Sequence, residues 1–348
     1  MARSSWSYLK GEKRTGEYEE LTVRSIGHWW MKDDPAWPEM LRDGYHLSSE
    51  TGVAMIEPTA LNTSDSAAYR DRFKLTYRSY VLQQDGEERK LDAIVEGAKK
   101  RGVFSETRMP LSITRQYIPA MRHYFWGSGM MQIYGATYTP YGPVMNSLLF
   151  QIFDSMRHAQ RLVELSWELN HGIAEPVDSH AAWLDWQPVQ PLRKFIEHGL
   201  TVFDWAETFV ALNFILDPIF LPMHDVMLLD IAEHEGDWAI AQFWLVLAED
   251  MKRHMVCGAD FVAAMLKESE HNLAIVQKWL DRWYPMAVDV LEGLRPLIDD
   301  ANRAGFPKRF EQLKIEILTR YADSLIPYGL TVPVTHGETY ESEAGFHG

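Results

Sequence analysis

A five-residue pattern, Asp-x-x-Arg-His, occurs twice in the chain, as Asp154–His158 and as Asp250–His254. Each copy lies within a long apolar stretch without proline or glycine, Val144–His171 and Asp237–Cys257. Such stretches predict helices, and charged side chains inside an apolar helix cost free energy unless they are paired. The repeat therefore constrains the fold, because the two helices must face each other for their charges to meet.

The expected pairs join the acid of one helix to the arginine of the other, Asp154 with Arg253 and Asp250 with Arg157. The two histidines, His158 and His254, are then neutral core side chains bonded to these acids. The alternative is two unrelated surface clusters. Neighbours such as Phe150 and Phe243 are too apolar for an exposed helix face and favour the buried interpretation.

The rest of the chain predicts an all-α fold. Residues from about 66 to 326 show helical patterning almost throughout, and alternating strand patterns bounded by turn residues are missing. We expect an N-terminal arm over residues 1–60, a helical bundle over 61–330 and a mobile tail over 331–348. The expected long helices are Val144–His171, Leu192–Leu216 (closed by Pro218), Asp237–Cys257, Trp279–Ala301 and Lys308–Ile326.

Composition excludes several functions. The net charge of −15 argues against a nucleic-acid partner, and the single cysteine, Cys257, excludes an internal disulfide or a cysteine-ligated iron–sulfur cluster. Phosphate-binding glycine motifs are missing, as are HExxH and GxSxG. The apolar run Phe209–Met223 is too short to span a bilayer, and no secretion signal opens the sequence. We therefore expect a cytoplasmic protein that does not bind membranes.

The repeat has the framework of a metal site without its ligands. Carboxylate-bridged di-iron bundles use a Glu-x-x-His on each of two helices and one further carboxylate from each of two others. The two Glu positions are Ser155 and Met251, and no acid occurs between Glu106 and Asp154, where a further carboxylate is expected near Phe125. A hydroxyl and a thioether do not replace bridging carboxylates. We therefore predict that this chain has no metal, cofactor or catalytic site.

Two alternatives remain open. Asp217 lies near the position of the second further carboxylate, so Asp217, His158 and His254 could hold a metal in a ferritin-like subunit with its own oxidase or oxygenase activity. The second alternative is that the chain is an unrelated helical scaffold.

Five segments carry a family resemblance over most of residues 5–260. The segments are W-S-Y-L-x-G from Trp6, L-T-Y-R-S-Y-V from Leu75, Q-x-F-D-x-x-R-H-x-Q-R from Gln151, W-Q-P from Trp186 and D-W-x-E-x-F-V-A-L-N from Asp204. They resemble the β (small, non-catalytic) hydroxylase subunits of bacterial multicomponent soluble di-iron monooxygenases, which act on propane, alkenes, phenol, toluene or methane.

The resemblance implies a ferritin-like helical bundle and a structural role. The di-iron centre is then expected in a partner α subunit, within an α2β2 or α2β2γ2 hydroxylase served by a coupling protein and an NADH-dependent reductase. The assembled enzyme would hydroxylate a hydrocarbon with O2. Ser155 and Met251 would fill the empty ligand positions, and the acids, arginines and histidines of the repeat would be a vestige of the residues around the metal.

The aromatic N-terminal arm is the expected contact with the α subunit, because interface cores favour such side chains. The expected interface residues are Trp6, Tyr8, Leu9, Tyr18, Trp29 and Trp30.

Overall fold

The computed structural model describes residues 16–22, 59–62, 69–139, 141–171 and 178–333, and these contain helices and no strand. The α-helices are α1 (Glu17–Thr22), α4 (Tyr77–Arg101), α5 (Ile118–Tyr138), α6 (Gly142–Asn170), α7 (Ser179–Asp185), α8 (Gln190–Gly199), α9 (Trp205–Phe209), α10 (Asp217–Asp225), α11 (Ile231–Glu235), α12 (Trp238–Glu268), α13 (Glu270–Gly293), α14 (Arg295–Arg303) and α15 (Phe310–Leu325).

Shorter helical segments join or extend these helices. Three are π-helical, η4 (Ser112–Tyr117), η6 (Val210–Leu216) and η7 (Val226–Asp230). Three are 3-10 turns, η3 (Val103–Glu106), η5 (Gln187–Val189) and η8 (Ile326–Tyr328).

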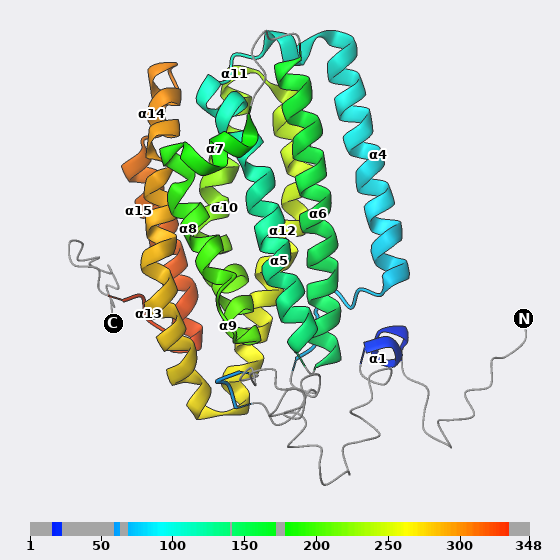
Figure 1. Ribbon diagram of the computed structural model, residues 1–348, viewed down its shortest axis with the longest axis vertical. Coiled ribbons are helices and arrows are strands. Elements are labelled where there is room, and N and C mark those ends of the chain that lie inside the picture. The colour runs from blue at the N-terminus through cyan, green and yellow to red at the C-terminus, as the bar shows by residue number, and fades with distance from the viewer. Residues whose placement is uncertain (1–15, 23–58, 63–68, 140, 172–177, 334–348) are drawn as a thin grey trace, which may run out of the picture.

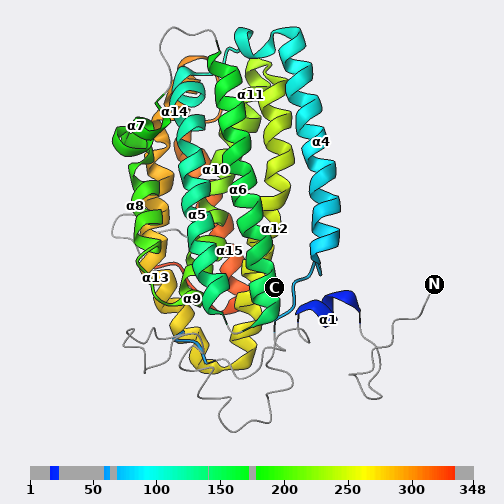
Figure 2. The same cartoon turned by 45° about the vertical axis from the view of Figure 1, so that its right-hand side comes forward.

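The helices form a bundle in which α5 and α6 lie side by side, with α12 behind them and α4 along one edge (Figures 1 and 2). Helices α8, α13, α14 and α15 cover the opposite edge (Figure 1). The run from α9 to α11 contacts α12 and α13 inside the bundle. One continuous apolar core fills the space between the helices. Among the described helices, none is both long and apolar enough to cross a membrane.

Glycines let α5 and α6 approach closely. A side chain at Gly129 would collide with Met156 of α6, and one at Gly135 would lie 3.0 Å from Leu148 of the same helix. Since residues without a side chain permit short distances between helix axes, these glycines set the spacing of the pair.

The predicted helix over residues 192–216 is interrupted in its middle. Helix α8 ends at Gly199, where a side chain would meet Met131 at 2.5 Å, and α9 starts afresh after Asp204. The Asp204 carboxylate caps α9 by accepting from the backbone N–H of Ala206 and of Glu207. A tertiary contact and a cap therefore break a stretch that looks continuous in sequence.

Pro218 does not end this helical run, although we expected it to. It follows the π segment η6 and lies in the first turn of α10. Proline has no N–H to donate to the carbonyl of Phe214, four residues earlier. The buried hydroxyl of Tyr321 on α15 donates to that carbonyl at 3.1 Å. A donor from another helix thus bonds to a carbonyl that Pro218 cannot serve.

The other predicted helices have different ends or are divided. The stretch Trp279–Ala301, which we expected to be interrupted by Pro285 and Pro296, forms two helices: α13 runs from Glu270 through Pro285 to Gly293, and α14 begins at Arg295 with Pro296 in its first turn. Helix α6 matches the stretch Val144–His171 within two residues, and α12 extends beyond Cys257 to Glu268.

Replacing Tyr321 by Phe removes the donor to the Phe214 carbonyl and leaves a buried acceptor unpaired. We expect Tyr321→Phe to lower the free energy of unfolding by about 1–3 kcal/mol in urea denaturation. The exposed Tyr77 gives a matched control, since Tyr77→Phe removes a hydroxyl on the surface. Equal effects of the two substitutions would contradict the role of the Tyr321 hydroxyl.

Candidate functional site

The two copies of the repeated motif meet in the interior, between α6 and α12. Asp154 of α6 is fully buried, and its Oδ2 accepts hydrogen bonds from the guanidinium of Arg253 and from His254 Nε2, the latter at 2.9 Å. Its Oδ1 accepts from the Tyr80 hydroxyl at 2.8 Å and from Gln84 Nε2 at 3.1 Å. Every donor to Asp154 therefore comes from α4 or α12.

Asp250 of α12 has the reciprocal set of partners. Its Oδ2 lies against the guanidinium of Arg157 and 3.2 Å from His158 Nε2, and its Oδ1 accepts from Gln84 Nε2 at 2.9 Å. Arg253 also reaches Asp250 Oδ1, at 2.9 Å. The structure thus forms both cross-helix pairs that the repeat predicts.

Charge is balanced within this cluster, which we call the α6–α12 cluster: Asp154, Arg157, His158, Asp250, Arg253, His254 and the bridging Gln84. Burial would raise the pKa of Asp250, but the hydrogen bond from His158 and the charges of Arg157 and Arg253 hold it well below its usual range. Burial lowers the pKa of His158, so its imidazole is neutral at pH 7. Two carboxylates thus face two guanidiniums in the interior of the bundle.

Sequence reasoning missed the contribution of α4. Tyr80, Gln84 and Glu88 recur every four residues and so lie on one face of that helix, where Glu88 pairs with Arg157 at 2.9 Å and with Arg161. Tyr80 belongs to the L-T-Y-R-S-Y-V segment, so a signal was present. The regular four-residue spacing of polar residues was the other signal.

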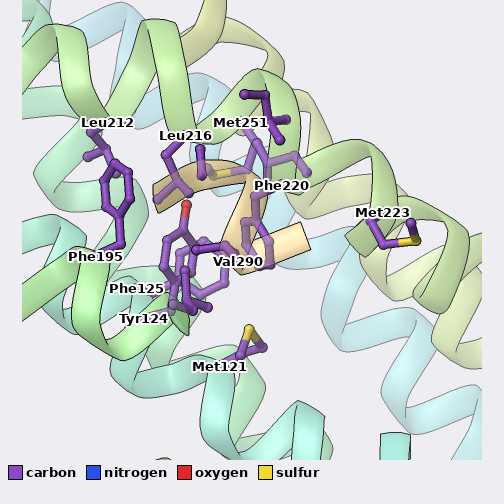
Figure 3. Close-up of a cluster of buried hydrophobic side chains, with 14 of the residues drawn as sticks. Met121, Tyr124, Phe125, Phe195, Leu212, Leu216, Phe220, Met223, Met251 and Val290 are labelled. Carbon is purple, nitrogen blue, oxygen red and sulfur yellow. The ribbon is translucent and has the colours of Figure 1, made fainter. Parts of the chain in front are cut away.

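Neutral side chains occupy the positions of the missing ligands. The Ser155 hydroxyl donates to Gln132 Oε1 at 2.9 Å, and Gln132 lies 3.4 Å from Gln151, to which Asn213 donates at 2.6 Å. Met251 lies in the apolar core beside Phe220 (Figure 3). These residues fill the interior without a charge.

Each histidine of the cluster has one bonded and one unbonded ring nitrogen. Their Nε2 atoms are held by carboxylates, while the Nδ1 atoms of His158 and His254 are buried without a hydrogen-bond partner. The edge of Phe125 packs against the His158 ring, with centroids 4.9 Å apart. An imidazole fixed by a carboxylate through one nitrogen normally offers the other to a metal.

The donor set does not fit a di-iron centre. Ser155, Met251 and Phe125 stand where bridging or terminal carboxylates are needed. Over the described ranges, no three side chains among His, Cys, Asp and Glu come together in a way that could hold a metal ion. Asp217, His158 and His254 are therefore not assembled into the alternative ligand set.

Asp217 instead lies in a pocket of the core with Tyr124. Its Oδ1 accepts from the Tyr124 hydroxyl at 2.7 Å, its Oδ2 has no partner, and burial raises its pKa to about 7. His224 is also fully buried, next to the Tyr117 hydroxyl, and burial lowers its pKa to about 3. His224 is therefore uncharged at pH 7, whereas Asp217 is about half ionised there, because burial disfavours the charged form of both groups.

Tyr18, which we expected at the partner interface, is buried within this chain. Its hydroxyl accepts from the backbone N–H of Asp71 at 3.0 Å, and burial raises its pKa to about 12. The sequence does not reveal that α1 packs near the base of α6. The other expected interface residues, Trp6, Tyr8, Leu9, Trp29 and Trp30, lie outside the described residues.

Breaking the cluster should be far more costly than breaking a surface ion pair. We expect Arg253→Met to lower the free energy of unfolding by about 3–5 kcal/mol, because it leaves Asp154 buried without its counter-charge. The adjacent Lys252, paired with Glu249 on the surface, provides the control, and Lys252→Met should cost less than about 1 kcal/mol. Similar losses for both variants in chemical denaturation would contradict the buried pairing.

Asp217 should make stability depend on pH. Its folded pKa of about 7 lies above its ordinary value of 3.8, so its contribution to stability is lost as the pH rises through 7. His224 has the opposite effect: between about pH 3 and 6.5 its contribution makes the folded chain more stable as the pH rises, because only the unfolded chain is protonated there. Asp217→Asn keeps the acceptor for Tyr124 but cannot ionise.

Relative to the unmodified chain, Asp217→Asn should therefore gain about 3 kcal/mol of stability between pH 4 and pH 8. Urea denaturation of both chains at several pH values measures this gain. A difference between them that does not change with pH would show that Asp217 does not carry the proton.

Known proteins share this architecture. Residues 42–269 match the family model described as Methane/Phenol/Alkene Hydroxylase. The chain resembles one subunit of phenol hydroxylase from Pseudomonas sp. OX1, with a TM-score of 0.76, 21% identity and 96% of each chain covered, which confirms the predicted ferritin-like bundle.

Its relatives are components of multicomponent enzymes. It is 28% identical to the hydroxylase component subunit beta of the toluene-4-monooxygenase system of Ectopseudomonas mendocina, over 90% of this chain and 97% of the relative. It is similar to two oxygenase components of phenol 2-monooxygenase from Pseudomonas sp. (strain CF600). Identity is 25% to DmpL (74% of this chain, 80% of the relative) and 24% to DmpN (64% and 44%). The chain belongs to the Methane/Phenol/Alkene Hydroxylase family, as a hydroxylase component of a multicomponent monooxygenase.

Proposed function

We propose that this chain is the non-catalytic β subunit of the hydroxylase. In this role it supports an iron-bearing α subunit of an NADH-dependent monooxygenase that hydroxylates a hydrocarbon or aromatic compound with O2. The observation that carries the proposal is the pair of buried histidines whose Nδ1 atoms have no partner, with Phe125 packed against the His158 ring and with Ser155 and Met251 at the expected ligand positions. Similarity to a beta subunit over nearly all of its length supports the assignment.

The structural role follows from how the cluster joins the helices. Gln84 of α4 bridges Asp154 of α6 and Asp250 of α12, so one side chain ties three long helices together. A bundle whose central helices are joined by hydrogen bonds has rigid outer faces, and a supporting subunit needs such faces. The chain would thus hold its partner in place and leave oxygen chemistry to the partner's metal.

The wider assembly is part of the same proposal. We expect α2β2 or α2β2γ2 stoichiometry in the cytoplasm, with a separate coupling protein and reductase. The N-terminal arm around Trp6, Tyr8 and Leu9 remains our candidate for one contact with α. The relatives that are named as components of toluene and phenol systems favour an aromatic substrate, with alkanes such as propane and alkenes as the other classes.

Iron content tests the proposal directly. We expect the chain, purified alone and offered Fe(II) without oxygen, to bind close to zero iron by elemental analysis, because its histidines lack carboxylate co-ligands. The partner subunit, treated in the same way, is the positive control. About two irons per chain would instead make this polypeptide an oxidase or oxygenase in its own right.

A further inference from the structure

Buried tyrosine hydroxyls in the core contact side chains that can accept a proton. Such pairs include Tyr80 with Asp154 at 2.8 Å, Tyr117 with Nδ1 of His224, and Tyr124 with Asp217 at 2.7 Å. Loss of one electron makes a phenol hydroxyl strongly acidic, so the proton leaves with the electron. Where solvent does not reach the hydroxyl, its hydrogen-bonded partner must take that proton. Each pair therefore has the parts of a tyrosine that can be oxidised reversibly.

The charge that remains after such a transfer differs from pair to pair. Asp154 is already held by the guanidinium of Arg253, and a proton on Asp154 would break this buried ion pair. A proton on His224 would create an imidazolium in the core, where burial disfavours the charged form. Oxidation is therefore unfavourable in the pairs that contain Asp154 and His224.

The Tyr124–Asp217 pair has the opposite balance of charge. Both side chains are buried, and Asp217 Oδ2 has no hydrogen-bond partner. Among the residues that the structure describes, no cation pairs with Asp217, so its ionised form is an uncompensated charge in the core. When Tyr124 loses an electron and passes its proton to this carboxylate, the products are a neutral phenoxyl radical and a neutral carboxylic acid. The removal of a buried charge favours oxidation at Tyr124 over the other two tyrosines.

The surroundings of Tyr124 shield a radical and still connect it to the surface. Figure 3 shows the ring among apolar side chains, and it packs against the ring of Phe220 with centroids 5.1 Å apart. From Phe220 the aromatic contacts continue to His224 at 5.6 Å and from there to Trp244 at 4.1 Å. Trp244 donates to the partly exposed Asp225 at 2.6 Å. An electron can therefore reach Tyr124 in short steps although solvent cannot.

We propose that Tyr124 is a redox-active tyrosine, with Asp217 as its proton acceptor, that gives one electron to a high-potential oxidant formed during oxygen activation in the hydroxylase. In the forward step the oxidant gains one electron, the O–H bond of Tyr124 breaks, and the proton forms an O–H bond on Asp217. In the return step an external one-electron reductant supplies the electron, and the proton moves back to the phenoxyl oxygen. The pair thus removes oxidising equivalents that escape the metal centre.

This redox role goes beyond the proposed function. It requires that the chain is a component of an oxygen-activating hydroxylase, and it is the same whether the iron lies in this chain or in a partner.

Laser flash photolysis of the purified full-length chain tests the pair. Tris(bipyridine)ruthenium(III), formed by the flash, is the one-electron oxidant, and transient absorption and electron paramagnetic resonance detect the neutral tyrosyl radical. The measurement is made at about pH 8.5, where Asp217 is ionised. We expect a tyrosyl radical that persists after the radicals of exposed tyrosines such as Tyr77 have decayed. It should form more slowly in D2O, because a proton moves with the electron.

Three variants assign the persistent signal. Tyr124→Phe removes the hydroxyl and should lower the signal at least about tenfold. Asp217→Asn keeps an acceptor for the Tyr124 hydroxyl but cannot become a carboxylic acid, and we expect a loss of similar size. Tyr80→Phe is the matched control, since it removes another buried hydroxyl that donates to an aspartate, and it should leave the signal unchanged. Circular dichroism confirms that each variant is folded.

Every outcome decides for or against the pair. Loss of the persistent radical in Tyr124→Phe and Asp217→Asn, with retention in Tyr80→Phe, supports the inference. An equal signal in all four chains, or no persistent radical in the unmodified chain, overturns it. A radical that Tyr124→Phe abolishes but Asp217→Asn retains shows that the carboxylate is not the proton acceptor, and this also overturns the inference. The iron content of the chain is measured separately, so failure here leaves the proposed function standing.

Discussion

The exchange of charge between α6 and α12 is the interaction on which the rest of the structure depends. Each carboxylate accepts from the arginine and the histidine of the opposite helix, and Gln84 of α4 bonds to both carboxylates. A shift of either helix by one turn would leave two acids and two guanidiniums buried without partners. The cluster therefore fixes the register of α4, α6 and α12, and the large aromatic side chains of the core pack between helices whose register is fixed.

The cluster was predictable from the sequence because its cause is local. An acid, an arginine and a histidine inside an apolar helix need partners, and a second copy of the same trio supplies them. Tyr80 and Gln84 were missed because the sequence does not show which face of α4 turns inward. The errors at Gly199 and Pro218 have the same origin. Met131 packs against Gly199 at the end of α8, and Tyr321 donates to the Phe214 carbonyl beside Pro218, and both residues are distant in sequence from the positions they contact. Fold class and central pairing thus follow from local chemistry, whereas helix ends depend on tertiary contacts.

Ser155 and Met251 complete the interior of the bundle in two different ways. The Ser155 hydroxyl joins a chain of amides through Gln132 and Gln151, whereas Met251 extends the apolar core toward Phe220 (Figure 3). Ser155 provides a hydrogen bond for polar groups that already face the interior. Met251 fills volume with a flexible side chain that adapts to an irregular space. Both leave the surrounding carboxylates and arginines undisturbed.

The unpartnered Nδ1 atoms of His158 and His254 have an evolutionary consequence. Each imidazole is held by a carboxylate through Nε2, and its Nδ1 is free to accept a further partner. A return to metal binding would nevertheless require carboxylates at Ser155, Met251 and Phe125 together. Any one of them alone would be a buried charge with no cation beside it, at a cost of several kcal/mol. Each single substitution therefore destabilises the bundle before a metal could offset the charge, so an iron site in this core needs all of the carboxylates at once.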